Sequence, residues 1–214
     1  MRPRQISLTL AVAFLFAVSS VFHGQSPKTT HVPEYTFKVI HVFPHDASAY
    51  TQGLVYHDGF LYEGTGLNGQ SSLRKVRLES GEVVQRMDLA REYFGEGITL
   101  FRNEILQLTW KSQVAFVYNL SDFHFLRQFN YSGEGWGLTT SGNELFMSDG
   151  TDEIRVLDGS TFKEKRRIKV QDGQKSITQL NELEFCTGRN LRQCVADEPD
   201  CTHLAPHGQG HGMD

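Results

Sequence analysis

The chain has 214 residues, of which 39% are hydrophobic and 21% charged, and this composition excludes intrinsic disorder and favours one globular domain. Its 21 basic and 25 acidic residues give a formal net charge of -4, so the positive charge on which nucleic-acid binding depends is missing. The 20 glycines and 15 phenylalanines favour turns and strands over long helices, and we expect an all-β protein.

The N-terminus has the pattern of a secretory signal peptide, which we assign to residues 1–24. Arg2 and Arg4 form a charged start, and an unbroken apolar run follows from Leu10 to Val18. This run is shorter than the roughly 20 residues that a membrane-spanning helix needs. We therefore expect a secreted or periplasmic protein that leaves the membrane after signal cleavage. An uncleaved membrane anchor is the alternative.

The chain then repeats with a period typical of a propeller blade. Apolar residues at the equivalent positions 54, 98, 138 and 183 lie 44, 40 and 45 residues apart. Each of the first three repeats contains four short strand-like runs, the first two joined by a turn such as His57-Asp58-Gly59. This pattern predicts a β-propeller over residues 25–185, with about three and a half blades. The alternative is a β-sandwich of short, evenly spaced strands.

Polar and aromatic residues gather at the start of each repeat. Because the innermost strand of each blade lines the channel of a propeller, these starts are expected to converge in space. They carry Tyr50 and Gln52, Phe94 and Glu96, Glu134 and Trp136, and Asn181, Glu182 and Glu184. A few polar groups within an aromatic wall are typical of a site for a small polar ligand. The alternative is that these residues only form turns at the rim.

Eight short segments carry a specific pattern in one order between residues 37 and 185. They are Tyr50–Leu54, Glu63–Gly66, Ser71–Arg74, Phe94–Gly97, Gln107–Trp110, Gly135–Leu138, Ser148–Thr151 and Leu180–Glu184. In order and spacing they resemble the glutaminyl cyclases of the plant and bacterial type, also called glutamine cyclotransferases. The resemblance implies a five-bladed propeller that converts the N-terminal glutamine of peptides or proteins to pyroglutamate and releases ammonia. Tyr50 stands where this family usually has phenylalanine, and it keeps the aromatic wall.

The resemblance also implies roles for single residues. Glu96 would be the proton-transfer residue, and Gln52, Trp110, Trp136 and Asn181, with the aromatic residue 50, would bind the substrate. The chemistry requires such groups, because the attacking amine must lose a proton and the departing nitrogen must gain one. A carboxyl group desolvated by two indole rings has a raised pKa and can serve both steps. The alternative function is a noncatalytic propeller that binds peptides or a protein partner.

Residues 186–214 differ in composition from the rest of the chain. All three cysteines lie here, at positions 186, 194 and 201, with His203, His207 and His211 close by. No C-x-x-C pair is present, and prolines and glycines prevent a helix that would align the histidines, so we expect no metal site. We predict an unrelated and disordered tail, produced by a frameshift or fragmentation, that forms no regular strand ladder. A propeller interrupted in this way is expected to be poorly stable and inactive.

We expect no cofactor. A structural cation such as calcium at Asp149–Asp152 is the alternative to a plain turn there. The expected partners are peptides or proteins with N-terminal glutamine, and we expect a monomer.

Overall fold

The structure is a computed structural model that describes residues 36, 38–186, 190–194 and 202–204. The expected signal peptide, residues 1–24, lies outside the described residues, as does most of the expected tail. The described part contains strands and turns only, which confirms the all-β prediction. Within this part no helix is long and apolar enough to cross a membrane.

Three four-stranded antiparallel sheets form the body of the molecule, each with its strands in sequence order. The first sheet contains β1 (Thr51–His57), β2 (Phe60–Thr65), β3 (Ser72–Arg77) and β4 (Val83–Asp88). The second contains β5 (Gly95–Phe101), β6 (Glu104–Thr109), β7 (Val114–Asn119) and β8 (Phe125–Asn130). The third contains β9 (Leu138–Thr140), β10 (Glu144–Met147), β11 (Glu153–Asp158) and β12 (Glu164–Lys169). These are the three four-strand repeats that the sequence predicts.

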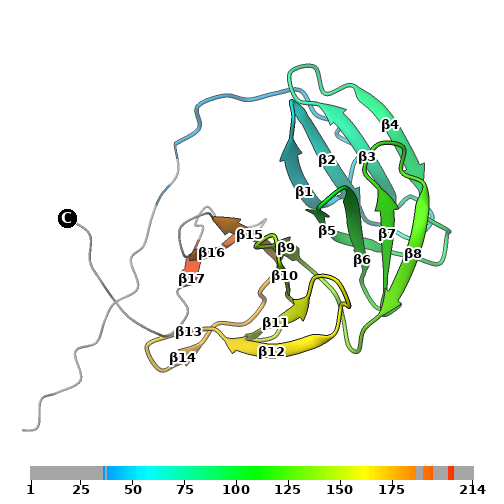
Figure 1. The fold of residues 1–214 in the computed structure, drawn as a ribbon. Coiled ribbons are helices and arrows are strands. Elements are labelled where there is room, and N and C mark those ends of the chain that lie inside the picture. The colour runs from blue at the N-terminus through cyan, green and yellow to red at the C-terminus, as the bar shows by residue number, and fades with distance from the viewer. Residues whose placement is uncertain (1–35, 37, 187–189, 195–201, 205–214) are drawn as a thin grey trace, which may run out of the picture.

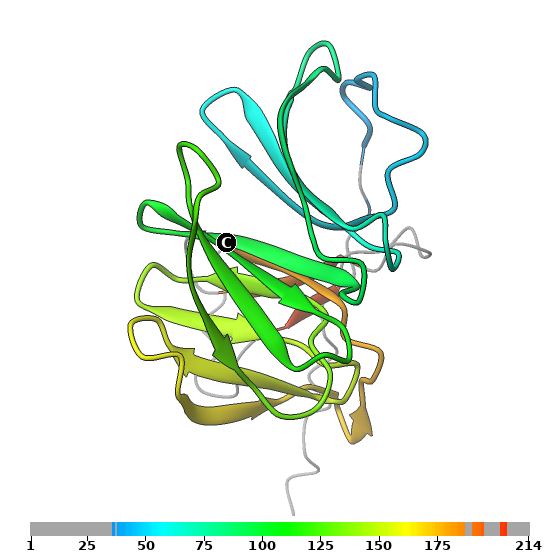
Figure 2. The same cartoon turned by 90° about the vertical axis from the view of Figure 1, so that its right-hand side faces the viewer.

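The sheets are arranged as an arc, with β1, β5 and β9 on its inner side and β4, β8 and β12 on its outer side (Figure 1). Seen from the side, successive sheets lie face to face as stacked layers (Figure 2). The inner strands contact one another in chain order, and β9 also contacts β15 (Glu182–Cys186). This radial arrangement is that of a propeller and not of a two-sheet sandwich. The total of five blades stays a prediction.

Glycines let the inner strands approach closely. A Cβ atom on Gly53 of β1 would lie 2.5 Å from the backbone nitrogen of Ile98 in β5. A Cβ atom on Gly97 would lie 2.8 Å from Cα of Gly137, the residue before β9. Real Cβ atoms do not come this close to backbone, so a side chain at either position would push the inner strands apart.

Alternation along each strand gives the second and third sheets two apolar faces. Ile105 and Leu106 are neighbours in β6 and both are fully buried, but Ile105 packs in a cluster with Tyr62 of the first sheet, and Leu106 packs with Leu145 of the third. A third cluster joins the third sheet to β15 and contains Phe146, Ile154, Val156, Val170, Leu180 and Leu183. The core is therefore a series of layers between sheets, and each sheet depends on its neighbours for burial.

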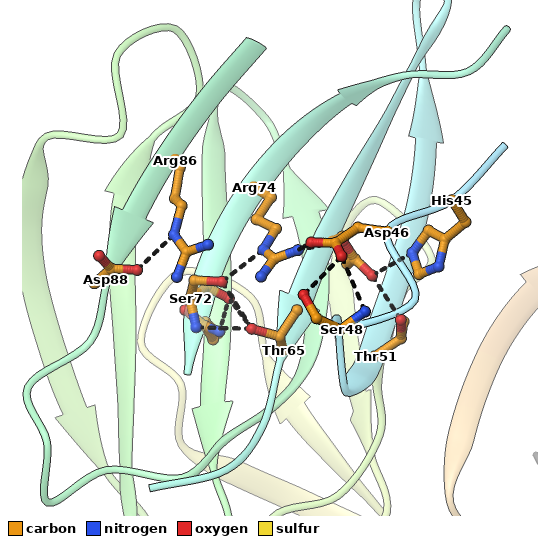
Figure 3. Close-up of polar contacts among 11 residues, drawn as sticks. His45, Asp46, Ser48, Thr51, Thr65, Ser72, Arg74, Arg86 and Asp88 are labelled. Atoms are coloured by element: carbon orange, nitrogen blue, oxygen red, sulfur yellow. Dashed lines mark hydrogen bonds and ion pairs between the residues drawn. The ribbon is translucent and has the colours of Figure 1, made fainter. Parts of the chain in front are cut away.

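A polar network ties the chain before β1 to the first sheet (Figure 3). The buried Glu63 carboxylate accepts hydrogen bonds from Thr51 Oγ1 over 2.5 Å and from His45 Nε2 over 2.8 Å. Arg74, also buried, donates from Nη1 to Asp46 Oδ2 over 2.9 Å. The network fixes the entry into β1, where the residues on either side of Thr51 were predicted to belong to the site.

The C-terminal segment differs from the expectation in part. β15 pairs with β16 (Asn190–Cys194), and β16 pairs with β17 (Thr202–Leu204). A short hairpin of β13 (Gln171–Asp172) and β14 (Lys175–Ser176) precedes this sheet. The prediction that no strand ladder forms beyond residue 186 is therefore wrong for these two strands. The sequence of β16 contains no proline or glycine, so nothing in its backbone opposes pairing.

Candidate active site

Glu96 lies at the start of β5 and is only 6% exposed. Nε2 of Gln52, from β1, donates a hydrogen bond of 3.5 Å to Glu96 Oε1. Burial, and to a lesser extent the negative charge of Glu134, raise the pKa of Glu96 to about 8. A carboxyl group with this pKa is largely protonated at neutral pH and ionises within reach of it. It can therefore both donate and accept a proton.

Two irregular positions in the inner strands place Gln52 and Glu96. In β1 the register shifts between Thr51 and Gly53, and in β5 it shifts between Gly95 and Ile98. Each shift leaves an extra residue on the inner strand, as in a β-bulge, which turns a side chain away from the regular alternation. Both predicted polar residues of the site therefore occupy the same kind of position in neighbouring blades.

The two tryptophans meet at one carboxylate oxygen. Trp110 follows β6 and Trp136 precedes β9, and both are half-buried. Their Nε1 atoms donate to Oε2 of Glu134 over 2.6 Å and 2.9 Å respectively. Nζ of Lys111 lies 3.8 Å from Glu134 Oε1 and 3.9 Å from the centre of the Trp110 ring. The hydrogen bond from Trp136 is the largest cause that lowers the pKa of Glu134, so this carboxylate is negatively charged at neutral pH.

An aromatic row continues from Trp110 toward β1. The ring of Phe94 packs edge-to-face against Trp110 with centroids 5.4 Å apart, and Tyr50 packs edge-to-face against Phe94 at 6.2 Å. Tyr50 is 52% exposed and lies at the outer end of the row. The other indole, Trp136, lies against Gly150, where a Cβ atom would be 2.7 Å from the ring. The two indoles and the row together form an apolar wall beside the acid.

Asn181 joins this group through its backbone. Its carbonyl oxygen accepts a 2.6 Å hydrogen bond from Ser148 Oγ, and it lies against Gly137. The next residue, Glu182, has a buried Oε1 atom without a hydrogen-bond partner, placed where a Cβ atom on Gly97 would be 2.8 Å away. Burial, and then the charge of Glu96, raise the pKa of Glu182 well above its ordinary value. Burial therefore favours the neutral form of Glu182.

The structure brings together most of the residues that the sequence predicts. Glu96 contacts Gln52 directly, both indoles are joined through Glu134, and residue 181 borders the same inner strands. The hydrogen-bonding role of Glu134 and the buried acid of Glu182 were missed. Both residues stand at repeat starts, so the repeat pattern marked their positions, but only the fold reveals what they contact.

Among the residues that the structure describes, no three His, Cys, Asp or Glu side chains lie close enough together to hold a metal ion. At the proposed cation position, Asp149 Oδ1 instead accepts hydrogen bonds from the backbone nitrogen and Oγ1 of Thr151, over 3.1 Å and 2.5 Å. Asp152 lies 3.5 Å from Lys169. The side chains of the C-terminal cysteines and histidines lie outside the described part.

Comparisons with known proteins agree with this geometry. Residues 11–194 match the family model described as glutamine cyclotransferase. The chain is 37% identical over 187 residues to a glutaminyl-peptide cyclotransferase of Arabidopsis thaliana, a match that covers 84% of this chain and 58% of that protein. The chain thus spans less than two thirds of the length of that curated relative.

Solved structures show the same relationship. The crystal structure of Myxococcus xanthus glutaminyl cyclase is similar with a TM-score of 0.70 and 29% identity, over 80% of this chain and 71% of that one. The Neurospora crassa Pan2 WD40 domain, at 12% identity and a TM-score of 0.54, covers 73% of this chain and 51% of that one and shares the fold alone. By sequence and by structure, the chain belongs to the glutamine cyclotransferase family.

Proposed function

We propose that this chain carries the acid and the aromatic wall of a glutaminyl-peptide cyclotransferase, which converts N-terminal glutamine to pyroglutamate. The observation that supports this most is the buried Glu96, which is held by Gln52 and has a pKa of about 8. A binding module needs exposed aromatic side chains, but it gains nothing from a buried acid whose pKa lies near neutrality. The noncatalytic propeller is therefore the less favoured alternative.

The reaction balances with one carboxyl group. The α-amine nitrogen of the substrate forms a bond to the side-chain carboxamide carbon, and that carbon loses its bond to the amide nitrogen. The amine gives up a proton, and the departing nitrogen gains one and leaves as ammonia. Ionised Glu96 accepts the first proton and, once protonated, donates it to the leaving nitrogen. The carboxyl group returns to its starting form, so no other reactant is consumed.

The surrounding residues are suited to hold the reacting conformation. Ring closure requires the glutamine side chain to fold back on its own amine, and fixing that geometry contributes much of the rate of an intramolecular reaction. Trp110 and Trp136 offer an apolar wall against which the aliphatic part of the side chain can pack. The amides of Gln52 and Asn181 can both donate and accept hydrogen bonds, as the carboxamide requires. We assign these four residues, with Tyr50, to substrate binding.

A direct assay tests the proposal. The full chain is incubated with a peptide that begins with glutamine, and pyroglutamyl peptide and free ammonia are measured together. Glu96→Gln should lower turnover by roughly 10²–10⁴-fold, the usual contribution of a positioned acid–base group. Glu79→Gln, in an exposed turn of the first sheet, is the matched control and should retain turnover. If neither this chain nor a version with a family-type C-terminus converts the peptide, although both bind it, the noncatalytic alternative is favoured.

We also propose an exported protein, with residues 1–24 as signal peptide and residues 25–185 as the propeller body. The support is the charged start and short apolar run described above.

We further propose a monomer whose substrates are peptides or proteins with N-terminal glutamine, and catalysis without a cofactor. The support for the last point is that the acid–base chemistry is complete with carboxyl, amide and aromatic groups.

A further inference from the structure

Glu134 accepts a hydrogen bond from each of the two indoles, its charge acts on Glu96, and the family resemblance assigns it no role. We propose that Glu134 is a positioning residue, whose carboxylate fixes Trp110 and Trp136 in one arrangement and keeps a permanent negative charge beside Glu96. The catalytic importance of Glu134 rests on the proposed function. Its contacts with the two indoles and its effect on Glu96 can be tested without measuring turnover.

One oxygen atom links two blades. Trp110 leaves the second sheet after β6 and Trp136 leads into the third sheet at β9, yet both Nε1 atoms donate to Oε2 of Glu134. An indole N–H can only donate, so holding two of them requires an acceptor at that point. A charged oxygen accepts such bonds more strongly than an amide oxygen does. The hydrogen bond from Gly135 nitrogen to the Trp110 carbonyl, at 3.0 Å, keeps the same backbone segments together.

The charge of Glu134 acts on Glu96. The titratable groups around Glu96 are Glu134, Glu182 and Tyr131, and Nζ of Lys111 lies 3.8 Å from Glu134 Oε1. Burial raises the pKa of Tyr131 to about 12 and that of Glu182 well above its ordinary value, and so favours the neutral form of both groups. Lys111 is 62% exposed and pairs with Glu134 over 3.8 Å, which helps to keep Glu134 ionised. Glu134 is therefore the permanent anion of the site and favours the protonated form of Glu96.

The chain contains only two tryptophans, and both are at this carboxylate. Tryptophan emission of the full-length protein therefore reports on this site alone, whether or not the protein is active. In the wild type, emission should change in acid, when Glu134 becomes protonated, and again around pH 8, when Glu96 ionises. Because these two transitions are measured without turnover, they test the role of Glu134 independently of the proposed function.

The experiment compares three variants with the wild type: Glu134→Gln, Glu134→Asp and the control Glu79→Gln. For each protein it measures tryptophan emission as a function of pH, KM, and the pH profile of kcat/KM. In Glu134→Gln we expect the acid transition to disappear and the transition near pH 8 to move down by roughly 0.5–1 pH unit, because the repelling charge is gone. KM should rise because the indoles are no longer fixed. Glu134→Asp keeps the charge but is one methylene shorter, so it should raise KM and leave the upper transition in place.

Unchanged emission, upper transition and KM in a folded Glu134→Gln would overturn the proposal. If that variant does not fold, Glu134→Asp decides the positioning role, and wild-type values of its emission and KM would overturn it. If no variant turns over peptide but the emission transitions move as described, Glu134 positions the indoles as proposed and the cyclase function is what fails.

Discussion

Glu96→Gln should change how the stability of this protein depends on pH. The folded-state pKa of Glu96 is about 8 against an ordinary value of 4.5. Between these two pH values the folded protein therefore retains the proton of Glu96, whereas the unfolded chain has released it. Over that range the free energy of unfolding of the wild type falls by about 1.4 kcal/mol per pH unit through this group alone. The total loss between pH 4.5 and pH 8 is about 5 kcal/mol, and further increase in pH adds little.

Glutamine removes this dependence because it is neutral at every pH. Its side-chain oxygen can still accept the hydrogen bond from Gln52, so the packing of the site is retained. We expect the variant and the wild type to be equally stable near pH 4.5. At pH 8 the variant should be more stable by up to about 5 kcal/mol, while its turnover is lost.

Urea unfolding followed by tryptophan emission at several pH values between 4.5 and 9 measures this difference. The slope of the unfolding free energy against denaturant should stay the same in the two proteins, so that the midpoints report stability. Parallel pH curves for the wild type and Glu96→Gln would refute the reasoning, because they would mean that Glu96 titrates alike in the folded and unfolded chain. Glu79→Gln should follow the wild-type curve, since this side chain is exposed.

Four further predictions follow from the geometry. Glu182→Gln should match the wild type in stability near pH 4.5 and exceed it at pH 8, because the raised pKa of Glu182 makes its ionised form costly; urea midpoints measure this. Gly97→Ala should lower the free energy of unfolding by about 1–3 kcal/mol, since the new Cβ atom would lie 2.8 Å from Gly137 Cα. A thermal melting curve measures this, and an unchanged midpoint would contradict the close approach of β5 and β9. Leu106→Ala, in the fully buried layer between the second and third sheets, should cost about 2–5 kcal/mol in urea unfolding. Treatment with a chelator should leave peptide turnover unchanged, and activity that depends on added zinc would show that the site assignment is wrong.

The sequence predicts the sheets better than the contacts between them. Turn signals and apolar alternation, as in His57-Asp58-Gly59 before β2, predict the four-strand repeats because these are local features. The layering of Ile105 and Leu106 into different clusters also follows from alternation once the blades are known. The pairing of β16 was missed because the composition of the whole segment, rich in glycine and proline, obscured a short run that contains neither.

The charge states of the site could not be predicted from residue types, because three identical side chains behave in three different ways. Glu134 receives two indole N–H groups at one oxygen and is ionised. Glu182 has a buried oxygen without a hydrogen-bond partner, and burial favours its neutral form. Glu96 receives one long hydrogen bond from Gln52 and is buried beside the charge of Glu134, and its pKa is raised to about 8. Only a group with an intermediate pKa can exchange a proton in both directions near neutral pH, so the donors that the fold brings to each carboxyl group determine which of the three can act as the acid and base.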